Sequence, residues 1–160
     1  MSGLEYEKLK KEHTDSLLSL WGDKDVIRYT NIKEPCSFED TEDRISRLAV
    51  FDVFVVKFNG DIAGVIGCPA VDRNAHKFGV FYQFKKQYWN KGIATESVEW
   101  LLGYMKVKYV DAVLYADVVT DNSASEKILK NFGFSLISTA ENEFERDGVK
   151  MNVNNYILKI

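Results

Sequence analysis

The sequence has little of what marks membrane, secreted or divided proteins. Its 160 residues contain only two prolines and no Ser/Gly-rich linker. The longest stretches without a charged residue, 62–71 and 131–140, are ten residues each, well short of the roughly 18 needed to span a bilayer. The N-terminus is charged from its fifth residue and has no apolar signal region. We therefore expect a cytoplasmic protein that makes no membrane contact.

Cysteine and histidine are too sparse for a zinc site. Cys36 and Cys68 are 32 positions apart, with no second cysteine pair and no nearby histidine. A structural zinc needs four convergent ligands at short spacings. Without a secretion signal a disulfide is disfavoured. We expect two free thiols and no metal.

Charge of one sign is not in large excess either. The 21 Lys and Arg against 24 Asp and Glu give a net charge of -3, with no basic block. This disfavours a nucleic-acid partner bound through phosphate neutralisation. Hydrophobic residues make up 46% and aromatic residues 13%, which is enough for one sizeable core. The length indicates a single domain over 1–160.

The hydrophobic pattern predicts an α+β fold with a mixed sheet, in the order β-α-α-β-β-β-α-β-α-β-β. The expected elements are a strand at 3–9, helices at 11–21 and 37–50, strands at 53–58, 62–67 and 76–84, a helix at 92–105, a strand at 110–119, a helix at 122–131, and strands at 134–145 and 149–160. Asn59-Gly60 predicts a type I′ hairpin turn, and Ser37 with Asp40 a capping box. The strand–helix–strand unit over 76–119 implies a parallel pair with a right-handed crossover.

The stretch Tyr88-Trp89-Asn90-Lys91-Gly92-Ile93-Ala94-Thr95-Glu96 lies where a strand leads into an amphipathic helix. A helix start offers unpaired N–H groups and the positive end of the macrodipole, which favour a phosphate. Gly92 allows a tight turn, Ala94 leaves room for a ligand, and Lys91 adds a positive charge. The pattern indicates a pyrophosphate site; an ordinary helix entry with a glycine turn is the alternative.

The same stretch resembles the acyl-CoA pyrophosphate loop of the GNAT superfamily of N-acetyltransferases, Arg/Gln-x-x-Gly-x-Gly/Ala. Gly92 and Ala94 match, while Trp89 replaces the usual Arg or Gln. The sequence of this stretch is most similar to that of the ribosomal-protein N-terminal (alanine/serine) acetyltransferase branch, Tyr-Trp-Gly-Lys-Gly-x-Ala-Thr-Glu. A second block is similar to that branch's Asn-x-x-Ser…Leu…Gly-Phe signature: Asn122-Ser123-Ala124-Ser125, Leu129 and Asn131-Phe132-Gly133-Phe134. The order of elements also resembles the GNAT order.

The resemblance implies a GNAT-like fold and an enzyme that uses acetyl-CoA as co-substrate. The acetyl group passes to a primary amine by direct attack in a ternary complex, with no acyl-enzyme. The pantetheine arm is expected to pair with a strand edge like an added strand. The residues that the resemblance assigns to acetyl-CoA are Tyr82, Phe84, Trp89, Asn90, Lys91, Gly92, Ile93, Ala94, Thr95 and Asn122.

The catalytic acid and base are predicted with help from the same resemblance. Many GNAT enzymes protonate the thiolate with a Tyr seven residues after the Asn; here Leu129 stands there, and Ser125 is the substitute. Lys77 stands where a Glu base is often found. On the last hairpin Glu143 belongs to an alternating acidic series, which predicts a shared face. We take Glu143 as the base; a water-mediated base and a merely solvent-facing acidic edge are alternatives.

The acceptor that the resemblance favours is a protein N-terminal amine, ribosomal or other. A small amine, such as a polyamine or an aminoglycoside-like compound, is the alternative within the class, and acid-rich elements suit a cationic acceptor. A non-catalytic acyl-CoA-binding module is a further alternative, because Leu129 and Lys77 depart from the usual pattern. Monomer and homodimer both remain open.

Overall fold

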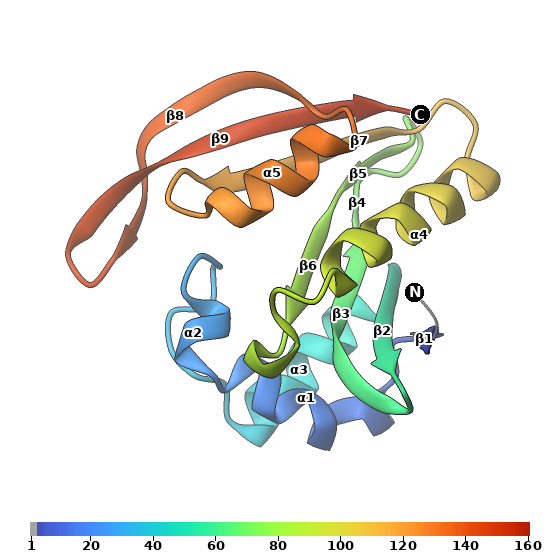
Figure 1. Cartoon of the computed structure of the whole chain (residues 1–160), viewed down its shortest axis with the longest axis vertical. Helices are drawn as coiled ribbons and strands as arrows, with labels where there is room; N and C mark the ends of the chain where they lie inside the picture. The colour runs from blue at the N-terminus through green and yellow to red at the C-terminus, as the bar shows by residue number, and fades with distance from the viewer. Residues whose placement is uncertain (1–2) are drawn as a thin grey trace. The chain divides into compact units, whose positions relative to one another are not determined.

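The computed structural model describes residues 3–160, and it confirms an α+β fold built on the predicted order of elements (Figure 1). The elements are β1 (Leu4–Lys8), η1 (Lys11–His13), α1 (Thr14–Trp21), α2 (Lys24–Ile27), α3 (Phe38–Leu48), β2 (Asp52–Phe58), β3 (Asp61–Cys68), β4 (Ala70–Asp72), β5 (Lys77–Gly79), β6 (Phe81–Phe84), η2 (Lys86–Tyr88), α4 (Ile93–Lys108), β7 (Val113–Val119), α5 (Ser123–Asn131), β8 (Ser135–Arg146) and β9 (Val149–Lys159). The short elements α2 and β4 are additions to the prediction.

The described chain forms two compact units. The first contains residues 3–69 and 81–101, and the second Ala70–Val80 and Leu102–Ile160. Each unit has one sheet, ordered β1-β2-β3-β6 in the first and β4-β5-β7-β9-β8 in the second. No helix within residues 3–160 has the length and apolar character required to cross a membrane. The single domain expected over 1–160 stays a prediction.

The sheet of the first unit is antiparallel throughout, and its central hairpin is the predicted one. Asn59 and Gly60 separate β2 from β3 and have φ of 51° and 88°. A type I′ turn needs positive φ at both central residues. This turn also fixes the register in which β2 pairs with β3.

Both faces of this sheet are covered, because alternate residues of β2 point to opposite sides. Val53 and Val55 are fully buried in a core cluster shared with α1 and α3. Phe54 points the other way, toward Trp100 of α4, with ring centroids 5.0 Å apart. Tyr6 of β1 stacks on the same indole at 4.0 Å. Burial on both faces explains why β2 reads as a continuous apolar run.

In the second unit, β5 and β7 form the predicted parallel pair, with Phe78 opposite Leu114. The strand predicted over 76–84 is, however, interrupted at Val80. Its first half, β5, lies in the second sheet and its second half, β6, in the first. The Val80 N–H donates to the carbonyl of Tyr115 at 2.7 Å and completes the pairing with β7.

The start of α3 gives a first testable prediction. The Ser37 hydroxyl accepts a hydrogen bond from the Asp40 N–H at 3.1 Å, and the Asp40 carboxylate accepts one from the Ser37 N–H at 3.0 Å. This confirms the capping box. We expect Ser37→Ala to lower the free energy of unfolding by about 1 kcal/mol, measured by urea denaturation.

Ser46→Ala is the matched control for this substitution. Ser46 lies on the exposed side of the same helix, where its hydroxyl donates to the Glu42 carbonyl. Its removal should change stability by no more than about 0.5 kcal/mol. Equal losses in the two variants would mean that the cap contributes nothing beyond the loss of a serine.

Candidate active site

β6 lies at one edge of the first unit's sheet. Within residues 3–160 its partner in this sheet is β3, with Ile66 opposite Tyr82 and Gly64 opposite Phe84. An edge strand presents backbone groups to which an extended ligand can add like another strand. Tyr82 and Phe84, predicted to lie along the pantetheine arm, are two positions apart in this strand. Their contact with acetyl-CoA stays a prediction.

Trp89 stabilises the turn between β6 and α4 through a side-chain hydrogen bond. Its indole N–H donates to the carbonyl of Phe84 at 2.7 Å, while the side chain is 39% exposed. An indole has only this one donor. Trp89 therefore holds the turn against the strand, and any contact with acetyl-CoA has to use its ring.

The backbone after Trp89 curls twice through left-handed conformations. Asn90 has φ of 60° and Gly92 has φ of 78°. Asn tolerates this region better than most residues, and Gly has no Cβ to clash there. The next residue, Ile93, is 1% exposed and anchors the first turn of α4 in the core. The tight turn predicted at Gly92 is confirmed.

The first turn of α4 has the donor arrangement of an anion site. The Glu96 N–H donates to the Gly92 carbonyl at 3.1 Å and so begins the helical hydrogen bonding. The N–H groups of residues 93–95 come before it and have no acceptor inside the helix. The helix dipole adds positive potential, and Lys91 beside it is exposed. The donors and charge fit a pyrophosphate group.

Asn122 and Ser125 lie together in the second unit at the start of α5. The Asn122 side chain caps the helix by accepting from the Ser125 N–H at 3.4 Å. The Ser125 side chain is half-buried. Leu129, in the position of the usual catalytic Tyr, is 1% exposed and belongs to the core. Asn122 is therefore the N-cap of α5, which is compatible with a role at the ligand.

A hydrogen-bond network that no sequence pattern indicates holds α5 in place. Glu126 accepts a hydrogen bond from the Tyr156 hydroxyl at 3.0 Å and another from the Asn154 amide, both on β9. Tyr156 is 1% exposed, and burial with the nearby Glu126 raises the pKa of its hydroxyl. The network fixes the helix that carries Ser125. In sequence, Glu126 reads only as a helix-cap residue.

Glu143, the predicted base, lies at a bulge of the long β8–β9 hairpin drawn in orange and red in Figure 1. Pairing passes from Ala140 opposite Val153 to Phe144 opposite Met151. Asn142 has φ of 55° within this bulge. The strand alternation that predicted a shared acidic face is interrupted here. Glu143 is exposed, and its role as base stays a prediction.

A second network missed from the sequence lies in the first unit. The Trp21 indole N–H, from α1, donates to the Gln83 side chain on β6 at 2.6 Å. Lys86, just after β6, pairs with Asp25 of α2 at 2.6 Å. Trp21 is fully buried in the core of the first unit. Its polar partner is 62 positions away, and no local pattern indicates it.

One cluster of possible metal ligands occurs within the described residues. Ligand atoms of Glu7, Glu12 and His13 lie within 4.8 Å of one another. Glu7 pairs with Lys57 at 2.6 Å, and the His13 ring accepts from the Lys10 N–H at 3.0 Å. Lys57 lowers the pKa of the Glu7 carboxyl. The Glu7–Lys57 pair thus joins β1 to β2, and the His13 ring holds the start of η1.

Comparison with known proteins identifies the domain type. The family model of the acetyltransferase (GNAT) domain matches residues 4–135. The N-acetyltransferase p20 of Bacillus licheniformis is 24% identical over 139 residues, which are 82% of this chain and 78% of the relative.

Two solved structures show the same fold. RimL, the ribosomal L7/L12 alpha-N-protein acetyltransferase in complex with coenzyme A, matches with a TM-score of 0.89 at 17% identity, over 100% of this chain and 96% of its own. The microcin C7 self-immunity acetyltransferase MccE, in complex with acetyl-CoA and AMP, matches with a TM-score of 0.84 at 16% identity, over 100% and 94%.

Proposed function

We propose, because this chain belongs to the GNAT family of N-acetyltransferases, that it transfers the acetyl group of acetyl-CoA to a protein N-terminal amine. The observation that carries the proposal is the start of α4. There the left-handed backbone at Gly92 and the leading N–H groups of the helix form a site suited to a pyrophosphate. A cytoplasmic location is part of the proposal.

Acetyl-CoA would be held by two features of the first unit, the start of α4 and the edge of β6. The pyrophosphate would accept hydrogen bonds from the first turn of α4 and pair with Lys91. The pantetheine arm would follow the edge of β6. Asn122, in the second unit, is the remaining residue that we assign to the co-substrate.

The reaction needs an amine, a base and an acid. The neutral amine nitrogen attacks the thioester carbonyl carbon, the new C–N bond forms, and the C–S bond breaks. The nitrogen loses one proton, which we assign to Glu143, and the leaving thiolate gains one, which we assign to Ser125. An N-terminal amine has a pKa of about 8 and is partly neutral near pH 7, so only a modest base is required.

The proposed acceptor is supported by the solved structures. RimL acts on the N-terminus of the ribosomal protein L7/L12, and its structure covers this chain from end to end. A protein N-terminus is also an acceptor that a direct-attack enzyme can use without forming an acyl-enzyme.

Two measurements test the proposal. Acetyl-CoA at 100 times its dissociation constant should stabilise the protein by about 2.7 kcal/mol, seen as a rise in melting temperature. Release of free thiol should then occur with peptides that have an unblocked N-terminus and not with the same peptides blocked. No thermal shift would contradict the co-substrate. A shift with thiol release only from polyamines or aminoglycosides would contradict the acceptor.

A further inference from the structure

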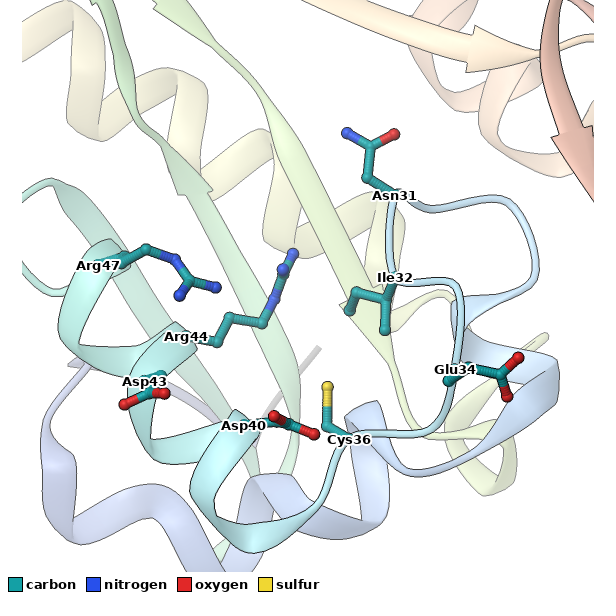
Figure 2. Close-up of a pocket in the computed structure, with 8 residues that line it drawn as sticks. All are labelled: Asn31, Ile32, Glu34, Cys36, Asp40, Asp43, Arg44 and Arg47. Atoms are coloured by element: carbon teal, nitrogen blue, oxygen red, sulfur yellow. The ribbon is translucent and has the colours of Figure 1, made fainter.

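The first unit contains a hollow of about 260 Å³ beside α3 (Figure 2). The lining residues come from α3 and from the segment that precedes it: Asn31, Ile32, Glu34, Cys36, Asp40, Asp43, Arg44 and Arg47. In Figure 2 the two guanidinium groups extend from α3 to the same side. The hollow therefore brings two positive charges together.

Neither guanidinium has an ion-pair partner among the described residues. No acidic side chain among residues 3–160 forms a salt bridge with Arg44 or Arg47. The Arg44 Nε is buried and has no hydrogen-bond partner. Burial, and to a lesser degree the charge of Arg47, lowers the pKa of the Arg44 guanidinium. A buried donor without an acceptor is costly, and like charges one helical turn apart repel.

The three carboxylates that line the hollow, those of Glu34, Asp40 and Asp43, form no ion pair with the arginines. Asp40 accepts a hydrogen bond from the Ser37 N–H, and this contact lowers the pKa of its carboxyl. Figure 2 shows Asp43 and Glu34 with their carboxylates turned away from the guanidinium groups. The arginines are therefore available to an anion from outside the chain.

A chain of contacts connects the hollow to β6. The Arg44 guanidinium lies 5.1 Å from the centre of the Trp21 ring. The Trp21 indole N–H donates in turn to the Gln83 side chain at 2.6 Å. Gln83 belongs to the strand that we propose for the pantetheine arm. The hollow, Trp21 and β6 all lie in the first unit.

The geometry points to an acceptor subsite: Arg44 and Arg47 bind a carboxylate that follows the reacting amine, so the preferred acceptor is a peptide N-terminus with an acidic residue close behind it. This inference rests on the proposed function. A guanidinium pairs with a carboxylate through two parallel hydrogen bonds, and a carboxylate would give the Arg44 Nε its missing acceptor.

The activity test compares two short peptides that differ in one group. One has Asp at its second position and the other has Asn, which is nearly the same shape without the charge. We expect the wild-type kcat/KM to be about tenfold higher for the Asp peptide, as for hydrogen bonds to a charged group. In the double variant Arg44→Gln, Arg47→Gln, kcat/KM for the Asp peptide should fall to the value for the Asn peptide. The value for the Asn peptide and the affinity for acetyl-CoA should stay unchanged.

Arg28→Gln is the matched control. Arg28 is an exposed arginine of the same unit that lies over the Tyr29 ring and does not line the hollow. It should keep the full preference for the Asp peptide. An equal loss in this variant would assign the preference to overall charge and overturn the subsite.

A second readout does not depend on turnover. Cys36 lines the hollow and is half-buried, whereas Cys68 is 1% exposed. A thiol reagent should therefore label Cys36 first. The Asp peptide should slow this labelling in the wild type and not in the double variant, and the Asn peptide should slow it in neither.

The two readouts separate the subsite from the proposed function. Protection of Cys36 by the Asp peptide without acetylation of any peptide would support the anion subsite and reject the proposed acceptor. Acetylation of both peptides at equal rates without protection would overturn the subsite and keep the proposed function. Free aspartate is the remaining comparison: if it protects Cys36 and is acetylated faster than the Asp peptide, the carboxylate belongs to an amino acid and the peptide assignment is wrong.

Discussion

Gly92→Val should abolish the thermal stabilisation that acetyl-CoA gives to the wild-type protein. Gly92 has φ of 78°, which a β-branched residue adopts only with strain. Its side chain would also stand at the entrance to α4, where the phosphates need the backbone N–H groups. At 100 times the wild-type dissociation constant, the expected loss is the full shift of about 2.7 kcal/mol. A melting assay with and without acetyl-CoA measures it.

Gly148→Val separates the effect of strain from the effect on binding. Gly148 also has φ of 78°, and a Cβ built on it meets nothing within 4 Å. It lies in the turn between β8 and β9. Both variants should melt lower than the wild type without ligand, by a similar amount. Only Gly92→Val should lose the response to acetyl-CoA; a retained response would contradict the pyrophosphate site at the start of α4.

Local sequence signals were sufficient for most elements of the fold. The Asn59-Gly60 turn and the Ser37–Asp40 capping box depend on residues adjacent in sequence, and both form as predicted. Gly133, with φ of 87°, follows the end of α5, where a glycine in the left-handed region commonly ends a helix. In each case the physical cause lies within a few residues, so a single sequence contains it.

The break at Val80 could not be predicted in the same way. Phe78 before the break and Phe81 and Tyr82 after it are aromatic strand formers, so the local pattern predicts one strand. The break is set by distant partners, since β5 pairs with β7 while β6 pairs with β3. Choice of partner is a tertiary property, and it overrides the local pattern.

One part of the candidate site could be predicted from local sequence, and another part could not. The loop around Gly92 is compact in sequence, and its pattern carries both the resemblance and the physical argument. The hollow at Arg44 and Arg47 has no such signal in the sequence. Arginines three positions apart on a helix are typical of a solvated face. What distinguishes Arg44 is burial beneath a separate segment and the ring of Trp21 beside it. Only the folded chain brings these together.

Ser125→Ala should lower kcat by about 100-fold or more while leaving acetyl-CoA affinity unchanged. This is the lower range for the loss of a general acid. The cap of α5 should survive, because Asn122 accepts from the Ser125 backbone N–H, which alanine keeps. The helix should therefore stay in place and only the hydroxyl be lost. Steady-state kinetics with saturating acceptor, together with the acetyl-CoA thermal shift, measure the two quantities.

Ser123→Ala and the dependence on pH distinguish an acid from a structural serine. Ser123 is exposed in the same first helical turn, and its loss should change kcat less than twofold, about 0.4 kcal/mol of activation free energy. A cysteine thiol has a pKa of about 8.5, and an alkyl thiolate leaving group likewise needs a proton less as the pH rises into and above that range. The defect of Ser125→Ala should therefore shrink as the pH rises from 7 to 9.5. A defect that stays constant with pH, or one that appears in acetyl-CoA affinity, would assign Ser125 to the binding of the co-substrate and leave the proton to water.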